Sequence, residues 1–174
     1  MTRRARITLR SGEAGDAPKL HALIVANQAE GHLLPRSLPE LVQHATRFVV
    51  AVRNRRIVGC AELAPLSTQV AEVRSLAVHQ TARGQGVGTM LVNELRTRAR
   101  HGGYDRLCAF THAPGYFMPM GFSIVPHLWV AEKVYTDCVK CPQFRRCGQY
   151  AMVLPLEHLA DTAEPDALFA ARHA

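Results

Sequence analysis

The chain has 174 residues, of which 48% are apolar and 20% are charged, and its formal net charge is +7 at pH 7. This length suits one globular domain, and the apolar fraction excludes a disordered protein. The longest strictly apolar runs fall well short of the roughly 20 residues that cross a bilayer, so the sequence predicts no membrane span. The positive charge would suit either nucleic acid or a phosphorylated small molecule.

The N-terminal segment does not predict export. Its basic start at 2–6 is followed by an alternating and then polar stretch instead of an apolar signal core. Five cysteines in a chain without a secretory signal argue against a disulfide framework. We therefore expect a cytoplasmic protein.

Strand and helix patterns alternate through the first half of the chain. The predicted elements, in chain order, are a strand at 7–10, a helix from about 16 that stops at Gly31, a short helix from about 37, a hairpin of strands at 48–52 and 57–63, and a strand at 71–78. The connector at 32–37 is a candidate substrate loop.

The clearest helical periodicity starts at Gly86, since Val87, Leu91, Leu95 and Ala99 are spaced i, i+4. The next predicted elements are a left-handed helix end at Gly102 and Gly103, a strand at 106–111, a short helix from 114 to about 120 broken by Gly121, and strands at 123–125 and 149–154. A strand, a helix and a strand in this order predict a crossover unit.

The region around 126–148 contains two prolines and three cysteines, which predicts a long loop between the last two strands. We expect one domain over residues 1–156. The remaining residues, 157–174, are rich in alanine and acidic residues and predict a flexible tail.

The strongest chemical signal is Arg-Gly-Gln-Gly-Val-Gly at 83–88, between a strand and an amphipathic helix. Glycines let the backbone approach a phosphate, and the first-turn N–H groups of the helix lack intrahelical partners. A P-loop would need a lysine, which is missing, and a dinucleotide fingerprint would need a third glycine where Thr89 stands. The loop therefore predicts a different phosphate ligand.

The spacing of this loop resembles the acetyl-CoA motif of the GNAT N-acetyltransferases, and the likeness extends over about residues 5–155. The resemblance implies an α/β fold, with a mixed, strongly twisted sheet flanked by helices on both faces. It implies acetyl-CoA as co-substrate. Carried over to this sequence, the residues that bind it are Leu76, Val78, Arg83, Gly84, Gly86, Gly88 and Thr89.

Three stretches, at 31–37, 72–74 and 116–122, look like the acetyltransferase domain of bacterial N-acetylglutamate synthases. A cysteine-bearing stretch at 132–149 is similar to one in short, stand-alone members of that group. The resemblance implies transfer of an acetyl group to the α-amino group of L-glutamate, the first step of arginine biosynthesis, with aspartate and glutamine as open alternatives. We expect no amino-acid-kinase-like domain and no arginine feedback through one.

An acidic acceptor needs cations, and a guanidinium can hold a carboxylate in a bidentate way. Arg36 and Arg74 are the candidate substrate-binding residues, and Lys133 is a third. Each of them could instead be a solvated surface charge.

The reaction needs a base that removes a proton from the acceptor ammonium, and Glu72 is the candidate, with His112 and Glu62 as alternatives. Many GNAT enzymes carry a tyrosine four residues before a Gly-Phe pair, as an acid for the departing thiolate. Phe117 occupies that position here, and Tyr116 lies one residue away. Tyr116 is therefore a weak second catalytic candidate.

Cys138, Cys141 and Cys147 supply three soft ligands, and His127 could complete a tetrahedral zinc site. Because no second Cys-x-x-Cys is present, reduced thiols are the preferred interpretation and no metal is assigned. Cys60 and Cys108 lie in apolar strand contexts typical of core residues.

Other functional classes stay open. One is a GNAT enzyme acting on another small amine or a protein N-terminus, and another is a non-catalytic acyl-CoA-sensing domain. Nucleic acid is not an expected partner, because the basic residues are scattered and lack interleaved aromatics. A homodimer is an arrangement that the sequence leaves open.

Overall fold

The computed structural model describes residues 6–28 and 33–157. Within these residues, seven strands form one sheet in the order β1-β2-β3-β4-β5-β7-β6, in which only the β4–β5 pair is parallel. The strands are β1 (Thr8–Ser11), β2 (Phe48–Arg53), β3 (Arg56–Pro65), β4 (Val70–Val78), β5 (Arg106–Thr111), β6 (Ser123–Val125) and β7 (Tyr150–Pro155). The predicted mixed α/β fold is confirmed.

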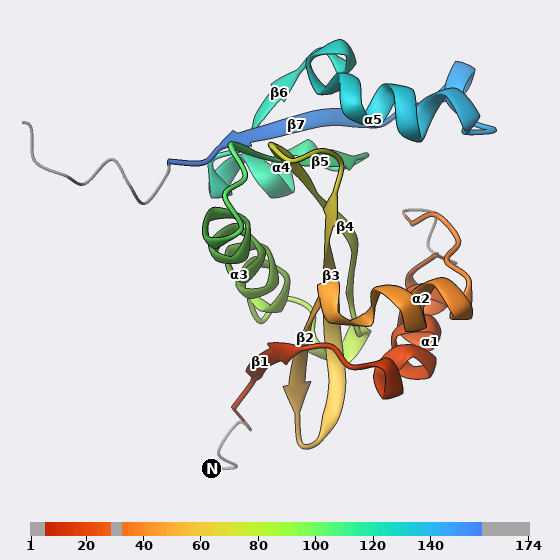
Figure 1. Cartoon of the computed structure of the whole chain (residues 1–174). Coiled ribbons are helices and arrows are strands. Elements are labelled where there is room, and N and C mark those ends of the chain that lie inside the picture. Colours follow the sequence, from red (N-terminus) through yellow and green to blue (C-terminus); the bar gives the residue numbers. More distant parts are fainter. Residues whose placement is uncertain (1–5, 29–32, 158–174) are drawn as a thin grey trace, which may run out of the picture.

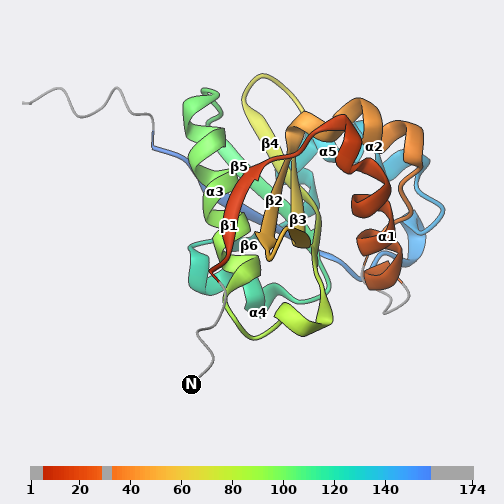
Figure 2. The same ribbon diagram turned by 90° about the horizontal axis from the view of Figure 1, so that it is seen from below.

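Helices cover both faces of this sheet (Figures 1 and 2). The α-helices are α1 (Ala17–Gln28), α2 (Leu38–His44), α3 (Val87–His101), α4 (Pro114–Phe117) and α5 (Ala131–Thr136). The 3-10 helices are η1 (Ala14–Asp16), η2 (Ala45–Arg47), η3 (Gln80–Ala82), η4 (Met118–Met120), η5 (His127–Val130), η6 (Cys138–Lys140) and η7 (Phe144–Arg146).

Successive side chains of β2 pack on opposite faces of the sheet, which explains why both faces are covered. Phe48 and Val50 pack in one core cluster with the apolar residues of α1 and α2, whereas Val49 and Ala51 pack in another with α3. Successive side chains of a strand point to opposite faces, so a continuous apolar run is expected where both faces are covered. α1 and α2 therefore lie on one side of the sheet and α3 on the other.

Helix ends follow local chemistry. The Ser37 hydroxyl accepts a 3.4 Å hydrogen bond from the Glu40 N–H and caps α2, as the connector sequence predicts. After α3 only Gly103 adopts a left-handed conformation (φ +75°), because Gly102 still has helical angles. Gly121, at φ +92°, ends η4 as predicted.

The two strands at the centre of the sheet diverge. β4 pairs with β5 only over Val70–Val73, so the rest of β4 has no strand neighbour on that edge among the described residues. On its other edge Ser75 and Leu76 both face one residue of β3, and Ser75 has φ +53°. This bulge and the divergence leave β4 backbone free for a ligand at the middle of the sheet.

The segment at 126–148 is more ordered than the loop that the sequence predicts, because it contains η5, α5, η6 and η7. Val130 anchors it by packing with Val70, Cys108 and Val153. The predicted flexible tail lies outside the described residues, apart from residue 157. Within residues 6–28 and 33–157, no helix is long and apolar enough to span a membrane.

Candidate active site

Two depressions are lined by successive parts of β4. One, here called the α5 cavity, has a volume of about 540 Å³ and takes residues 72–75 from β4, residues 33–36 from the α1–α2 connector, and its opposite wall from the segment that carries α5. The other, the glycine-loop groove, has about 570 Å³ and is lined by Leu76, Val78, the glycine loop and Tyr116. Along β4 the lining therefore changes from one space to the other at the bulge, between Ser75 and Leu76.

All seven residues predicted to bind acetyl-CoA line the glycine-loop groove. Gly84 and Gly86 have φ +69° and +75°, a conformation that favours glycine, and a Cβ at either position would point into open space. Gly86 is the N-cap residue of the 15-residue helix α3. The N–H groups in the first turn of a helix have no hydrogen-bond acceptor within the helix. This backbone suits the pyrophosphate of a CoA thioester.

Side chains from distant elements hold the loop in place. The Nε of Arg83 donates to the Val78 carbonyl at 3.0 Å, and its Nη2 donates to Asn27 Oδ1 at 3.0 Å. Arg53 Nη1 donates to Gln85 Oε1 at 3.0 Å. The loop is thus tied to the end of β4, to α1 and to the β2–β3 hairpin.

Tyr116 belongs to the glycine-loop groove and not to the α5 cavity. A Cβ on Gly88 would come within 2.0 Å of the Tyr116 hydroxyl oxygen. Burial raises the pKa of Tyr116, although a hydrogen bond with Thr89 opposes this, so the phenol keeps its proton at neutral pH. Phe117 is instead a core residue, packed edge-to-face against Tyr116 and Phe122.

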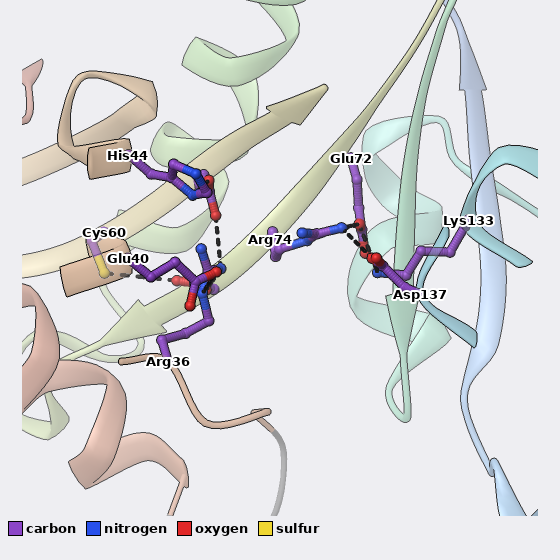
Figure 3. Close-up of polar contacts among 10 residues, drawn as sticks. Arg36, Glu40, His44, Cys60, Glu72, Arg74, Lys133 and Asp137 are labelled. Carbon is purple, nitrogen blue, oxygen red and sulfur yellow. Dashed lines mark hydrogen bonds and ion pairs between the residues drawn. The ribbon is translucent and has the colours of Figure 1, made fainter. Parts of the chain in front are cut away.

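Arg36 lines the α5 cavity, and its side chain is only 6% exposed. Figure 3 shows it close to Glu40 and His44. Its Nη1 donates to Glu62 Oε2 at 2.7 Å and to Ser75 Oγ at 2.9 Å, and its Nε lies 3.0 Å from Glu40 Oε1. Its buried Nη2 has no hydrogen-bond partner among the described residues. Buried donors normally have a hydrogen-bond partner, so an unpaired guanidinium nitrogen in a residue that lines a cavity points to an acceptor such as a carboxylate of a ligand.

Of the three candidate bases, Glu72 lines the α5 cavity. Glu62 is fully buried behind Arg36, with His44 Nδ1 at 3.3 Å from its Oε1. Neither Glu62 nor His112 is among the residues that line the cavity. The geometry therefore favours Glu72 as the group that can face a ligand.

Glu72 belongs to a four-residue cluster with Arg74, Lys133 and Asp137 (Figure 3). Glu72 Oε2 accepts from Arg74 Nε and from Lys133 Nζ, both at 2.9 Å. Asp137 Oδ2 accepts from Arg74 Nη2 at 2.6 Å and from Lys133 Nζ at 2.8 Å. Among the described residues, the hydrogen bonds of Glu72 all engage Oε2 and none engages Oε1.

Charge pairing sets the protonation of this cluster. Burial by itself would raise the pKa of Asp137, but Lys133 and Arg74 outweigh it, so the pKa lies below its usual value. Burial likewise opposes the charge of Arg74, and Glu72 and Asp137 outweigh it, so the pKa of Arg74 is raised. Arg74 is therefore a cation whose Nε and Nη2 already donate to protein carboxylates, unlike Arg36 Nη2.

Asp137 is the residue of this cluster that sequence reasoning missed. It stands four residues after Lys133, and an i, i+4 pair of opposite charge is a signal of helical contact. The sequence predicts a loop at 126–148, and an i, i+4 spacing indicates a contact only within a helix. The pair was therefore not recognised.

The three cysteines of this region also line the α5 cavity. His127 lies there too, edge-to-face against Phe110, with its Nε2 buried and without a hydrogen-bond partner among the described residues. In the described part of the chain, no three His, Cys, Asp or Glu side chains are arranged to hold a metal ion. The structure thus does not bring Cys138, Cys141, Cys147 and His127 into a zinc-ligating set.

Comparison with known proteins places this geometry in context. The model of the acetyltransferase (GNAT) family matches residues 19–122. A Chlorobaculum tepidum protein named uncharacterized N-acetyltransferase CT2212 is 29% identical over 148 residues, which is 85% of this chain and 96% of that protein. The amino-acid acetyltransferase of Neisseria meningitidis is 31% identical over 124 residues, or 70% of this chain, but only 28% of its own length is covered.

Solved structures show the same likeness. N-acetylglutamate synthase from Neisseria gonorrhoeae, complexed with coenzyme A and N-acetyl-glutamate, superposes with a TM-score of 0.77 at 25% identity, over 90% of this chain and 36% of that one. Rv2747 from Mycobacterium tuberculosis, solved with CoA, shares the fold with a TM-score of 0.73 at 23% identity, over 86% of this chain and 99% of that one. The chain thus spans about a third of the synthase, and nearly all of Rv2747.

Proposed function

Because the chain belongs to the acetyltransferase (GNAT) family, we propose that it transfers the acetyl group of acetyl-CoA to the α-amino group of an acidic amino acid, L-glutamate. The observation that carries the choice of acceptor is Arg36, a buried guanidinium in the α5 cavity whose Nη2 has no hydrogen-bond partner in the described structure. Such a donor stabilises a carboxylate far more than an ammonium or an apolar group.

The change of lining along β4 from one space to the other supports this function. Residues 72–75 of β4 line the α5 cavity, and Leu76 and Val78 of the same strand line the glycine-loop groove. An acceptor in the cavity and a thioester in the groove would therefore approach each other at the β4 bulge. Holding two reactants side by side converts a bimolecular reaction into an effectively unimolecular one.

Acetyl-CoA, when bound, supplies an activated acyl carbonyl. The chain itself must take a proton from the acceptor ammonium, and Glu72 is the carboxylate of the cavity in reach of that role. Arg74 and Lys133 fix Glu72 through Oε2, so that Oε1 faces the acceptor directly or through water. Tyr116 keeps a proton in the glycine-loop groove and is the donor for the departing thiolate.

The charges of the cavity argue against a polyamine acceptor. Glu40, Glu72 and Asp137 line the cavity, but each lies within ion-pair distance of Arg36, Arg74 or Lys133. The donor that remains without a partner among the described residues is Nη2 of the Arg36 guanidinium. Its positive charge repels the additional ammonium group of a polyamine. The N-acetylglutamate synthase named above is structurally similar, and the same activity in this chain would place it in arginine biosynthesis.

The test is release of CoA and formation of acetylated product with glutamate, glutamine, aspartate, lysine, spermidine and short peptides, for the natural protein and for Arg36→Lys. The lysine keeps the charge but loses the planar pair of donors. Turnover of glutamate, with a KM for glutamate about tenfold higher in Arg36→Lys, supports the proposal. Turnover of only amines or peptides contradicts the acceptor, and acetyl-CoA binding without any turnover favours a sensing domain.

A further inference from the structure

The five cysteines of the chain fall into two groups. Cys60 and Cys108 are fully buried in strands, and burial raises the pKa of Cys60 to about 12 and that of Cys108 still higher. The other three line the α5 cavity, with Cys147 exposed and Cys138 and Cys141 partly exposed. Only this second group can meet a reagent dissolved in the solvent of the cavity.

Backbone geometry holds two of these thiols together. Cys138 is the first residue of η6, and Cys141 directly follows its last residue. The Cys141 N–H donates to the Cys138 carbonyl at 3.0 Å. A four-residue turn closed in this way keeps its first and last Cα atoms within about 7 Å. A disulfide joins residues whose Cα atoms are about 4.4–6.8 Å apart, so the turn already has the span that a bridge needs.

The same turn is continuous with the Glu72 cluster. Asp137 immediately precedes Cys138 and is the N-cap residue of η6. Its carboxylate binds Arg74 at 2.6 Å and Lys133 at 2.8 Å. Because Asp137 is directly bonded to Cys138, any change in the backbone angles of Cys138 on bridging is passed to the carboxylate that binds both cations beside Glu72.

We propose that Cys138 and Cys141 form a thiol-modification site for low-molecular-weight disulfides, and that the bridge they form weakens the binding of the acceptor. The Cys141 thiolate attacks a disulfide RSSR, forming Cys141–S–S–R and releasing RS⁻, which takes up a proton as RSH. The Cys138 thiolate then attacks the Cys141 sulfur and releases the second RSH. Two protein thiols are oxidised to one disulfide, and RSSR is reduced to two RSH.

The order of attack follows from the surroundings of each thiol. Burial raises the pKa of Cys138, so this thiol attacks only after the reagent has been captured next to it, where the reaction is intramolecular. Cys147 is exposed and directly follows η7, as its C-cap residue, outside the turn. It serves as the matched control, because it shares the cavity but not the turn geometry.

The experiment treats the reduced protein with glutathione disulfide and maps the bridged and alkylated peptides by mass spectrometry. Acceptor and acetyl-CoA kinetics are measured before and after, with CoA quantified by chromatography. We expect a Cys138–Cys141 bridge, an acceptor KM raised by about tenfold, an unchanged acetyl-CoA KM, and reversal by dithiothreitol. Cys138→Ser and Cys141→Ser should each lose this response, and Cys147→Ser should keep it, each compared with its own reduced state.

Three results would overturn the proposal: no bridge, a bridge that includes Cys147, or a Cys138–Cys141 bridge that leaves acceptor kinetics unchanged. The kinetic part rests on the proposed function, but the peptide map does not. If acidic amino acids are not substrates, the proposed function fails by itself, and the kinetic arm is run with whichever amine turns over.

Discussion

Arg36 Nη1 and Ser75 Oγ lie 2.9 Å apart although 39 positions separate the two residues in the chain. Ser75 is the residue of the β4 bulge with φ +53°, so the contact joins the α1–α2 connector to the strained point of the central strand. A non-glycine residue in this conformation costs on the order of 1 kcal/mol or more, and it persists where its surroundings demand it.

The first prediction uses two replacements of Ser75 to separate the effect of its positive φ from that of its hydrogen bond with Arg36. Ser75→Ala keeps the strain and loses the hydroxyl, and Ser75→Gly loses both. We expect Ser75→Ala to lower the free energy of unfolding by about 1 kcal/mol. Ser75→Gly should be at least as stable as Ser75→Ala, while both raise the KM for the acceptor. Urea unfolding and acceptor kinetics check this, and a Ser75→Gly protein clearly less stable than Ser75→Ala would show that φ at this position is unstrained.

The second prediction concerns the ion pair of Arg36 with the fully buried Glu62. Arg36→Gln should lower the free energy of unfolding by about 3 kcal/mol, because it leaves a buried carboxylate without its guanidinium. The double variant Arg36→Gln with Glu62→Gln should regain most of that stability. It should not regain acceptor binding, and if it did, Arg36 would serve only the fold.

The third prediction concerns Glu72. Glu72→Gln keeps the shape of the side chain but cannot accept a proton, so kcat should fall by about 100-fold with little change in the KM for acetyl-CoA. Asp137→Asn is the control, since Asp137 shares the same cations: its effect should lie mainly in the acceptor KM. Equal kcat losses in both variants would argue that Glu72 acts only as an ion-pair partner.

The fourth prediction concerns Gly88 and Tyr116. A Cβ at Gly88 would displace the Tyr116 hydroxyl, which stands 2.0 Å from that position. Gly88→Ala and Tyr116→Phe should therefore lower kcat by similar factors, and the double variant should be no slower than either, because both act on one hydroxyl. Gly15→Ala, where nothing lies within 4 Å of the added Cβ, is the silent control. Additive losses would mean that Gly88 is needed for its own backbone.

The fifth prediction is a pH effect on stability. Hydrogen bonds from Arg10, at 2.6 and 2.9 Å, together with the Glu13 N–H, hold the pKa of Asp16 below its ordinary value against the opposing effect of burial. A lowered folded-state pKa gives stability that is present above about pH 4 and is lost as the pH falls through the folded pKa.

Asp16→Asn should therefore cost about 1 kcal/mol at neutral pH, a value reduced by the exposure of Arg10. The difference between the two proteins should shrink as the solution is acidified to below about pH 3. Chemical denaturation at both pH values measures it, and a difference independent of pH would assign the effect to packing.

Local spacing was sufficient to predict much of the fold. The period of α3 and the glycines before it depend on residues close in sequence, and the structure has them as expected. The bulge at Ser75 was not predictable, because a serine has no intrinsic preference for a positive φ. It arises from the pairing of β3 with β4.

The candidate site was predicted only in part, because its contacts are long-range. Lys133 reaches Glu72 across 61 positions and Asp137 reaches Arg74 across 63. The residue types suggested a site that binds a substrate carboxylate. They did not show which of its cations already form ion pairs with carboxylates of the protein. The helices at 126–148 were missed because each is only one or two turns long and depends on packing, such as that of Val130, instead of on periodicity.

The division of the α5 cavity between two parts of the chain bears on how such enzymes diversify. Arg36, Glu72 and the glycine loop lie inside the stretch that matches the family, whereas Lys133, Asp137 and the thiols follow its end at residue 122. One wall of the cavity thus lies within the span of the family model and the other lies beyond it. Exchange of residues 126–149 between relatives would be a direct way to graft a new acceptor preference onto an unchanged acetyl donor.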